Sequence, residues 1–430
     1  MGIVALGESL CQMEAAKPHP QSLTAHCSLL TFFGFITMKT KIDRNVVALG
    51  FVSFFTDMAS AMVNPILPIF IVVTLHEGVD KLGIVVAVAT FVSYALRLLS
   101  GYLSDRLGVV KPLVVAGYGI SALAKPLIGL SHSYKSVAAL KSAERLGKAL
   151  RSAPKDAMIA HYSPKKGAGR TFGFHKTLDI AGELGGTLLL FGLLAWFGQS
   201  ESVLRHIFLA TIVPGLIGLV IVIFFVRDIP KPPKQEGLHF RLDASDKAAL
   251  KSLLFYFLFL LFFFNEAFFT MEAKGVGIAT ATIPLLFVVS TLTQTLTSYY
   301  FGLLVDRMGF ERVMAASYLC GAAAQGLLWV QSPWATWIAY AFLGLFTVSS
   351  LNANRAMIAS KAKNRGTVYG IFYAAVALCG ALGALAAGFL WERFGMRAAL
   401  DYGLFGSGAL ALLFLFYSFY SMKGGRGDAA

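Results

Sequence analysis

The sequence has little charge, few cysteines and none of the short motifs that mark common enzyme classes. Charged residues make up 14% of its 430 residues, whereas about a quarter is typical of soluble domains. The four cysteines form no C-x-x-C pair, which argues against a disulfide framework and a zinc site. G-x-S-x-G, H-E-x-x-H and Walker A sequences are absent, so we expect neither an enzyme nor an ATP-driven pump, with no cofactor and no metal.

Apolar residues are abundant instead and occur in long blocks that recur from Val46 to Tyr420. They make up 57% of the chain, and each membrane-spanning helix requires about 20 of them in succession. The blocks predict an all-α membrane protein with twelve transmembrane helices. The expected helices are 46–74, 82–103, 112–131, 135–157, 169–196, 204–226, 249–270, 278–301, 313–331, 334–357, 367–391 and 398–421.

Positive charge is concentrated in the short segments between these blocks. The net charge of +14 would suggest nucleic acid in a soluble protein, but here it follows the pattern of orientation signals, and we expect no nucleic-acid partner. With the N-terminus inside, 24 of the 37 Lys and Arg lie in inside segments and six in outside segments. We therefore expect a multi-pass protein of the bacterial inner membrane with both termini in the cytoplasm.

The chain divides into two halves around a proline-rich, charged stretch at 227–248. Pro230, Pro232 and Pro233 favour a solvated linker there. This predicts one six-helix bundle over 42–226 and another over 249–430, the second with a short tail. Residues 1–41 precede the first bundle as a cytoplasmic lead, which is either disordered or the product of a mis-assigned start codon.

Self-similarity supports this division. G-Y-L-S-D-R-L-G at 101–108 recurs as G-L-L-V-D-R-M-G at 302–309, an offset of 201 residues, and A-M-I-A at 157–160 recurs at 356–359. Both repeats occur in the same order at nearly one spacing, which is hard to obtain by chance and indicates two related halves.

The G-x-L-x-D-R-x-G loop resembles the signature loop of the major facilitator superfamily, and 144–160 resembles the helix-four signature of a narrower group of bacterial permeases. The resemblance covers the chain from about Ile42. It implies two pseudo-symmetric six-helix bundles, secondary transport by alternating access, and a central cavity lined by helices one, four and five. It also implies a cytoplasmic latch in which the aspartate caps a helix or pairs with arginine. The latch candidates are Arg97, Gly101, Asp105, Arg106, Gly108, Gly302, Asp306, Arg307, Gly309 and Arg355.

Ionisable residues inside the predicted spans are concentrated in the first half. Such residues are rare in membranes and usually face a cavity or one another. Lys141, Arg145 and Lys148 share one face of the fourth helix, and His175, Asp179 and Glu183 follow one another at intervals of four on the fifth. The repeat places uncharged residues at the corresponding positions of the second half, namely Gly344 and Thr347 for Arg145 and Lys148, and Phe372, Val376 and Gly380 for the helix-five stripe. Helix packing therefore does not require these charges.

We expect the helix-four cations to bind an anionic or zwitterionic metabolite or siderophore, while Asp57, Asp179 or Glu183 takes up a coupling proton. The protein is expected to act as a monomer. As a structural alternative, these charges form static ion pairs that only hold the first half together. As functional alternatives, the protein is a multidrug pump, or a non-transporting sensor or scaffold. The direction of transport stays open. The candidates for solute binding and proton coupling are Asp57, Lys141, Glu144, Arg145, Lys148, His175, Asp179, Glu183 and Glu266.

Overall fold

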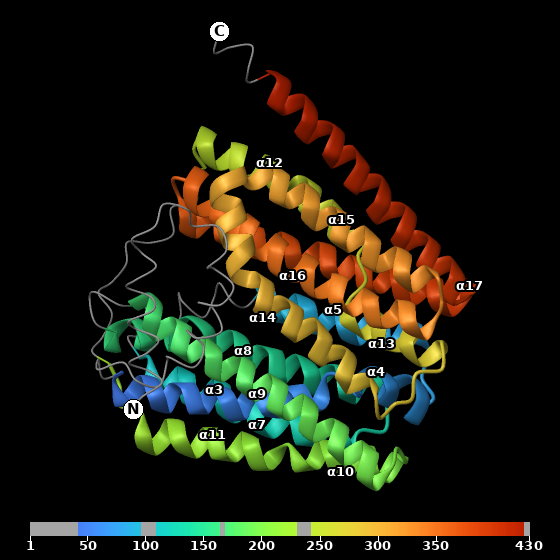
Figure 1. The fold of residues 1–430 in the computed structure, drawn as a ribbon. Coiled ribbons are helices and arrows are strands. Elements are labelled where there is room, and N and C mark those ends of the chain that lie inside the picture. Colours follow the sequence, from blue (N-terminus) through green and yellow to red (C-terminus); the bar gives the residue numbers. More distant parts are fainter. Residues whose placement is uncertain (1–41, 96–108, 164–167, 230–241, 425–430) are drawn as a thin grey trace, which may run out of the picture. The chain divides into compact units, whose positions relative to one another are not determined.

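The computed structural model describes residues 42–95, 109–163, 168–229 and 242–424. The predicted lead over 1–41 and most of the predicted linker lie outside these ranges, as do Arg97, Gly101, Asp105, Arg106 and Gly108. The described residues from Asp43 onward belong to one compact unit. All regular secondary structure in the described ranges is helical, which confirms the expected fold class (Figure 1).

Several predicted helices of the first half are interrupted. The span expected at 46–74 breaks at Asn64–Ile66 because Pro65 has no N–H to donate to the helix ladder. The span expected at 204–226 divides at Thr211. The observed helices are α3 (Arg44–Val63), α4 (Leu67–Ile69), the π-helix η1 (Phe70–Thr74), α5 (Val79–Ala95), α7 (Lys111–Leu127), the 3-10 turn η2 (Ile128–Leu130), α8 (Tyr134–Tyr162), α9 (Ala168–Phe197), α10 (Glu201–Ala210) and α11 (Ile212–Phe225).

The second half begins earlier than expected, because its first helix starts at Ala244, inside the stretch assigned to the linker. A capping box between Asp243 and Asp246 sets this start. The span expected at 249–270 is interrupted at Phe263–Asn265, after which a new helix begins. The helices are α12 (Ala244–Phe262), α13 (Glu266–Gly275), α14 (Ile283–Met308), α15 (Phe310–Trp329), α16 (Pro333–Lys361) and α17 (Arg365–Gly424).

The last of these helices contains the boundary that the sequence predicts between 391 and 398. Gly395 has φ +87°, a left-handed conformation that interrupts the helical path. Side chains other than glycine rarely adopt this angle, so α17 comprises two helical segments joined at Gly395.

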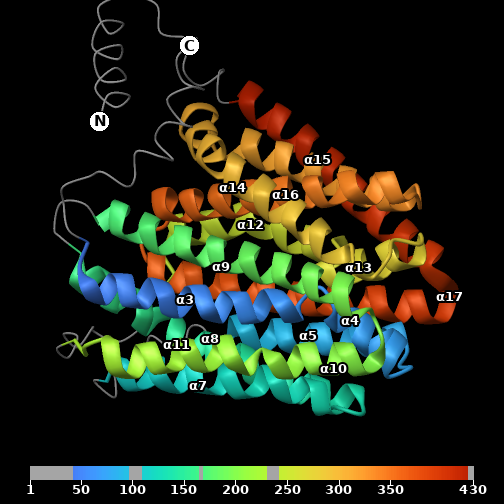
Figure 2. The ribbon, with the colours of Figure 1, turned by 60° about the horizontal axis from the view of Figure 1, so that its bottom comes forward.

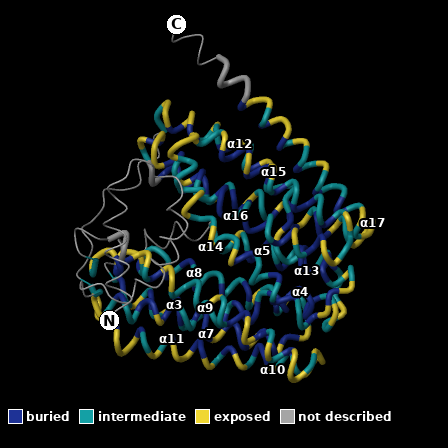
Figure 3. The backbone as a smooth tube through the Cα atoms, in the orientation of Figure 1, coloured by how far each residue is buried: buried dark blue, intermediate teal, exposed yellow. Residues whose placement is uncertain are grey.

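Seven described helical stretches are long and apolar enough to cross a membrane. They include residues 171–197, 333–361 and 367–418, whereas α8 falls outside the set because charged residues recur along it. Large apolar side chains project outward, among them Trp196 at 85% exposure. Figure 3 shows exposed residues along the outer sides of α10, α11 and α17, with buried residues on the sides that face other helices.

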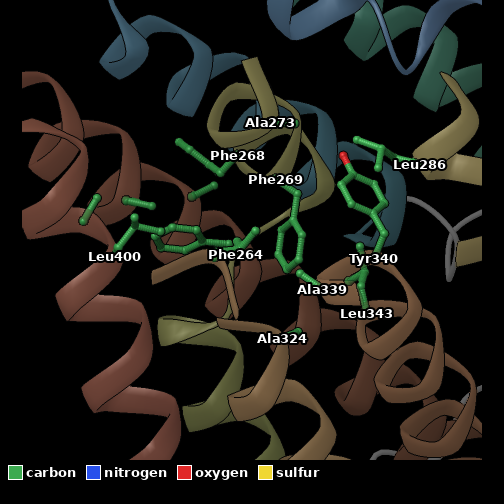
Figure 4. Packing of buried hydrophobic residues seen from close by; sticks show 14 of the residues in the cluster. Phe264, Phe268, Phe269, Ala273, Leu286, Ala324, Ala339, Tyr340, Leu343 and Leu400 are labelled. Carbon is green, nitrogen blue, oxygen red and sulfur yellow. The ribbon is translucent and has the colours of Figure 1, made fainter. Parts of the chain in front are cut away.

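Aromatic side chains fill much of the core of the second half. Phe264, Phe268 and Phe269 from the α12–α13 region pack beside Tyr340 of α16 (Figure 4). The Tyr340 hydroxyl lies 3.2 Å from Thr270 Oγ1, so its polar end is satisfied within the core. The interruption between α12 and α13 is therefore fixed by aromatic packing both at Phe264 and in the first turn of α13.

Glycines allow close contact between α3 and α9, which lie side by side in Figure 2. A Cβ at Gly182 would collide with the Phe54 carbonyl, and one at Gly186 with the Met58 carbonyl. Any larger residue at these two positions would push the α9 backbone away from the α3 backbone. Glu183, between the two glycines, is consequently carried on a helix that is pressed against α3.

Helices α5 and α17 bring the two halves into contact, and their backbones approach closely near residues 79–83 of α5 and 384–392 of α17, here called the contact end. A Cβ at Gly83 would lie 2.7 Å from the Ala384 carbonyl oxygen. The Val79 N–H donates to Glu392 Oε2 at 2.8 Å, so a carboxylate of the second half caps the first turn of α5.

Helices α9 and α14 touch toward the contact end and separate toward the other. Thr291 Oγ1 of α14 donates to Glu183 Oε1 of α9 at 3.1 Å. Figures 1 and 2 show the opposite ends of the same helices apart, and a Cβ on Gly173 or on Gly302 there would meet no atom within 4 Å. The structure is therefore closed between the halves at the contact end, and these two helices diverge at the far end.

Replacing Gly83 by leucine should shift the protein away from this conformation. Overpacking of a close contact typically costs about 1–3 kcal/mol, and here it falls only on the state in which α5 touches α17. We expect a longer distance between spin labels at Ser202→Cys and Arg393→Cys, measured by double electron–electron resonance in a background without the native cysteines.

Gly408→Leu is the matched control, because a Cβ at Gly408 meets nothing within 4 Å. An unchanged distance distribution in Gly83→Leu, or an equal change in Gly408→Leu, would contradict the assigned role of the contact.

Candidate functional site

A charged cavity of about 540 Å³ lies among α3, α8 and α9 and is completed by residues of the second half. We call it the charged cavity. Glu266, Phe287, Arg355 and Tyr373 are the contributions of the second half. Five of the predicted site residues line it: Asp57, Lys148, Asp179, Glu183 and Glu266.

Two of these side chains face the cavity with their charges uncompensated by direct bonds. Asp57 of α3 and Lys148 of α8 make no side-chain hydrogen bond or ion pair among the residues that the structure describes. Since charges inside a membrane protein are normally paired or in contact with water, both are available to a solute or to water in the cavity.

The other two cations of the predicted helix-four face are engaged by an acid. Glu144 is 1% exposed, and its Oε2 lies 3.1 Å from Lys141 Nζ and 3.4 Å from Arg145 Nε. Lys141 also donates to Asn64 Oδ1 at 3.0 Å, at the interruption that follows α3. Lys141 and Arg145 line a different cavity from Lys148, so the structure divides a set that the helical spacing groups together.

The helix-five stripe also divides. His175 Nδ1 lies 3.4 Å from Asp179 Oδ1, and its Nε2 lies 3.1 Å from Ser53 Oγ. Lys155 Nζ donates to the same Ser53 hydroxyl at 3.3 Å. Glu183 is separate from this network and accepts from Thr291 of the second half. His175 and Asp179 thus belong to a network within the first half, whereas Glu183 connects the two halves.

Helix α8 carries further cations that the predicted site does not include. Arg151 donates to Ser121 Oγ at 2.7 Å, and its guanidinium carbon lies 4.4 Å from the Tyr118 ring centroid, a cation–π contact. Arg151 and Lys155 both line the charged cavity. Arg151 follows Lys148 by three residues and Lys155 follows Arg151 by four, and this helical spacing is the signal that extends the cationic face.

A buried lysine on α7 was also missing from the predicted site. Lys125 is 1% exposed, and its Nζ donates to the Thr56 carbonyl at 2.9 Å. Thr56 precedes Asp57, so the lysine lies against the turn of α3 that carries this aspartate. A cation at this point stabilises an anion on the neighbouring residue.

A second cavity, of about 370 Å³, adjoins the charged one and has a different character. We call it the aromatic cavity. Asn64, Glu266 and Phe287 line both cavities, so the two meet there. Most of its aromatic wall comes from the second half: Tyr256, Phe263, Phe264, Phe287 and Phe346.

In the second copy of the latch motif, at residues 302–309, the backbone conformation requires a glycine at position 309. Gly309 has φ +83° and joins α14 to α15, with its N–H bonded to the Val305 carbonyl at 3.0 Å. Asp306 and Arg307 are exposed, and among the described residues neither side chain forms a hydrogen bond or an ion pair. Arg355, grouped with the latch in the sequence, lines the charged cavity.

No cluster of three or more metal-ligating side chains is present in the part of the chain that the structure describes. The arrangement can instead hold an organic ion. It offers cations on α8, carboxylates on α3 and α9, and hydroxyl and amide groups between them.

The chain matches the family profile described as Major Facilitator Superfamily over residues 49–273 and 267–426. An uncharacterized MFS-type transporter of Methanocaldococcus jannaschii is 31% identical over 367 residues, covering 82% of this chain and 89% of the relative. An uncharacterized protein of Mycobacterium tuberculosis is 27% identical over 325 residues, covering 72% and 78% of the two chains.

Solved transporter structures share the fold. The nucleoside transporter NupG superposes with a TM-score of 0.67 at 15% identity, covering 88% of this chain and 99% of that one. A POT family transporter in complex with 5-aminolevulinic acid gives a TM-score of 0.72 at 11% identity, covering 88% and 96%. A human organic anion transporter gives 0.60 at 16% identity, covering 88% and 100%.

Replacing Glu144 by glutamine should destabilise the protein strongly. The change leaves Lys141 and Arg145 next to each other without their shared counter-charge, and breaking a buried ion pair from one side typically costs about 3–5 kcal/mol. We expect a clear fall in the midpoint of thermal unfolding of the purified protein in detergent.

Glu201→Gln is the control, since the Glu201–Arg205 pair is at the surface, where the glutamate side chain is 57% exposed, and such pairs contribute about 0–1 kcal/mol. Equal midpoints for the two variants would show that the buried cluster has no structural role.

Proposed function

Because the chain belongs to the Major Facilitator Superfamily and is thus a secondary transporter in a membrane rather than an enzyme, we propose that it carries a small polar, anionic or zwitterionic solute through the charged cavity by alternating access. A metabolite or a siderophore is the class of solute meant. The observation that carries the proposal is Lys148, an α8 cation on the cavity wall with no bonded partner among the described residues.

The surrounding charges support an anion at this point. Arg151 and Lys155 line the same cavity on the same helix, and both are held in position by neighbouring hydroxyl groups. In a site with little water, such oriented cations interact with an anion far more strongly than they would in bulk solvent. Asp57 and Asp179, also on the wall, would accommodate the ammonium group of a zwitterion.

The position of Glu183 between the halves supports the proposal of proton coupling. Its carboxylate accepts a hydrogen bond from Thr291 of α14, and hydrogen bonds to an ionised acceptor are about twice as strong as those to a neutral one. Protonation of Glu183 would weaken a link between the halves, whereas proton release would restore it. The same proton could be exchanged with Asp179 or Asp57 across the cavity wall.

The orientation expected from the loop charges gives this conformation a direction. With both termini in the cytoplasm of a bacterial cell, the contact end faces outward, and the diverging ends of α9 and α14 face the cytoplasm. The structure would then represent an inward-facing state of a monomer in the inner membrane. A multidrug pump is a second candidate, favoured by the aromatic wall contributed by the second half.

A Lys148→Gln variant should lose the anionic solute. Removing one charge-assisted hydrogen bond costs about 1.5–3 kcal/mol, which corresponds to roughly a tenfold to hundredfold weaker affinity. We expect metabolite profiles, inside and outside the cell, to differ between a deletion strain and its wild-type complement, and the Lys148→Gln complement to resemble the deletion.

Lys247→Gln is the matched control, because Lys247 is exposed at the start of α12 and lines neither cavity. Full restoration by Lys148→Gln, or affected metabolites that are all uncharged, would reject the anionic assignment. A protein that moves nothing in liposomes while retaining a co-purified partner would favour a sensor or scaffold.

Glu183→Gln and Asp179→Asn should uncouple transport from protons. Neither amide can be protonated in the physiological range, so solute flux in proteoliposomes should lose its dependence on an imposed pH gradient in at least one of the variants. Glu201→Gln serves as the exposed-carboxylate control. Unchanged proton-coupled flux in both variants would overturn this part of the proposal.

A further inference from the structure

We propose, building on the transport function proposed above, that the solute is amphipathic: its ionised group binds at the charged cavity while an aromatic or apolar body occupies the aromatic cavity. The charged residues alone specify only an ion. The second cavity adds a requirement for shape and hydrophobicity, because an ion of small size would leave its aromatic wall in contact with water.

The aromatic cavity is formed by side chains that pack against one another and still line open space. Phe263 and Phe346 lie with ring centroids 4.2 Å apart, and Tyr256 is stacked on Phe372 at 5.9 Å. Phe287 contacts Tyr340 at 5.5 Å. Since these rings are held by the core of the second half, the cavity they line is preformed, as is usual for sites that bind small organic molecules.

The two cavities adjoin in the space between the halves. Phe287 of α14, Glu266 at the start of α13 and Asn64 after α3 border both. Glu266 and Asn64 are both next to helix interruptions, where the chain leaves its helical path. A molecule that occupies both cavities therefore passes the polar groups of Asn64 and Glu266 at the junction.

The cations of α8 are arranged to hold a head group at this junction. Arg145 lines the aromatic cavity and Lys148 lines the charged cavity, one helical turn apart. Arg145 shares Glu144 with Lys141, and its side chain is 26% exposed, so its guanidinium retains donors for another acceptor. An anionic group between Arg145 and Lys148 could bond to both while its body extends toward the second half.

A solute with an ionised group and an apolar body would account for the difference in composition between the two halves. The first half supplies charge, and the second supplies most of the aromatic surface. A solute that engages both faces binds best when the halves are in the arrangement that brings the cavities together. Its binding energy would then differ between conformations, as population shift by a ligand requires.

The test measures binding of acetate, phenylacetate and 2-naphthylacetate to the purified full-length protein in lipid nanodiscs. These probes carry the same carboxylate and differ in apolar area. Burial of one aromatic ring should strengthen binding roughly tenfold to hundredfold, so we expect affinity to rise along the series. Thr347→Trp, which places a large side chain on the wall of the aromatic cavity, should remove the gain and leave acetate unchanged.

Two further variants separate the possible failures. Phe263→Ala should flatten the series by removing part of the aromatic wall, whereas Phe405→Ala, a control on the outer surface at 67% exposure, should not. Lys148→Gln should weaken all three probes equally. Equal affinities for the three probes in the unmodified protein, or a series unaffected by both Thr347→Trp and Phe263→Ala, would overturn the amphipathic solute while leaving the anionic transporter intact.

Failure of the proposed function would look different. Binding of all three probes that is insensitive to Lys148→Gln, or no binding of any probe, would reject the anion site itself and the inference that rests on it.

Discussion

A charged side chain within a membrane must find a partner or face a polar cavity, and the first half of this protein is organised around that constraint. On α8, Lys141 and Arg145 share the buried carboxylate of Glu144, while Lys148 faces the charged cavity. The same helix therefore contains both a structural ion cluster and a cation available to a solute. Ionisable residues that were equivalent by spacing differ in role because their neighbours on other helices differ.

Close backbone contact is the second determinant of the structure. Glycines on α9 bring it against α3, and Gly83 brings α5 against α17. The contact between α9 and α3 lies within the first half, whereas the contact between α5 and α17 joins the two halves. Glu392, which caps α5 across the interface, adds a polar bond to the same contact. Under the alternating access proposed above, the contact between halves would break in each cycle, while the contact within a half would persist.

The pairing of a charged cavity with an aromatic one connects these features to solute choice. Charge alone would select any small ion of the correct sign, and an aromatic wall alone would accept many hydrophobic molecules. Their junction at Asn64, Glu266 and Phe287 is the basis for proposing a solute that combines both properties. The proposed anionic metabolite would use mainly the charged cavity, and the proposed hydrophobic drug would use mainly the aromatic cavity of the same site.

Much of the architecture followed from the sequence. The all-helical membrane fold was confirmed, and the two-half organisation inferred from the repeat is consistent with the family match over residues 49–273 and 267–426. Long apolar runs determine helices in a membrane because every backbone group there must be bonded within its own segment. Helical spacing grouped the candidates of α8 and α9, and five of the nine candidate residues line the charged cavity: Asp57, Lys148, Asp179, Glu183 and Glu266.

Helix ends and pairings required the tertiary structure. The interruption before Glu266 and the early start of α12 depend on local capping and packing, which apolar run lengths do not reveal. Spacing along one helix could not show that Glu144 pairs with two of the three cations, that Lys155 reaches Ser53 on another helix, or that phenylalanines of the second half line a cavity. The periodicity of a helix determines which residues share a face, but only the packing of separate helices decides what each face meets.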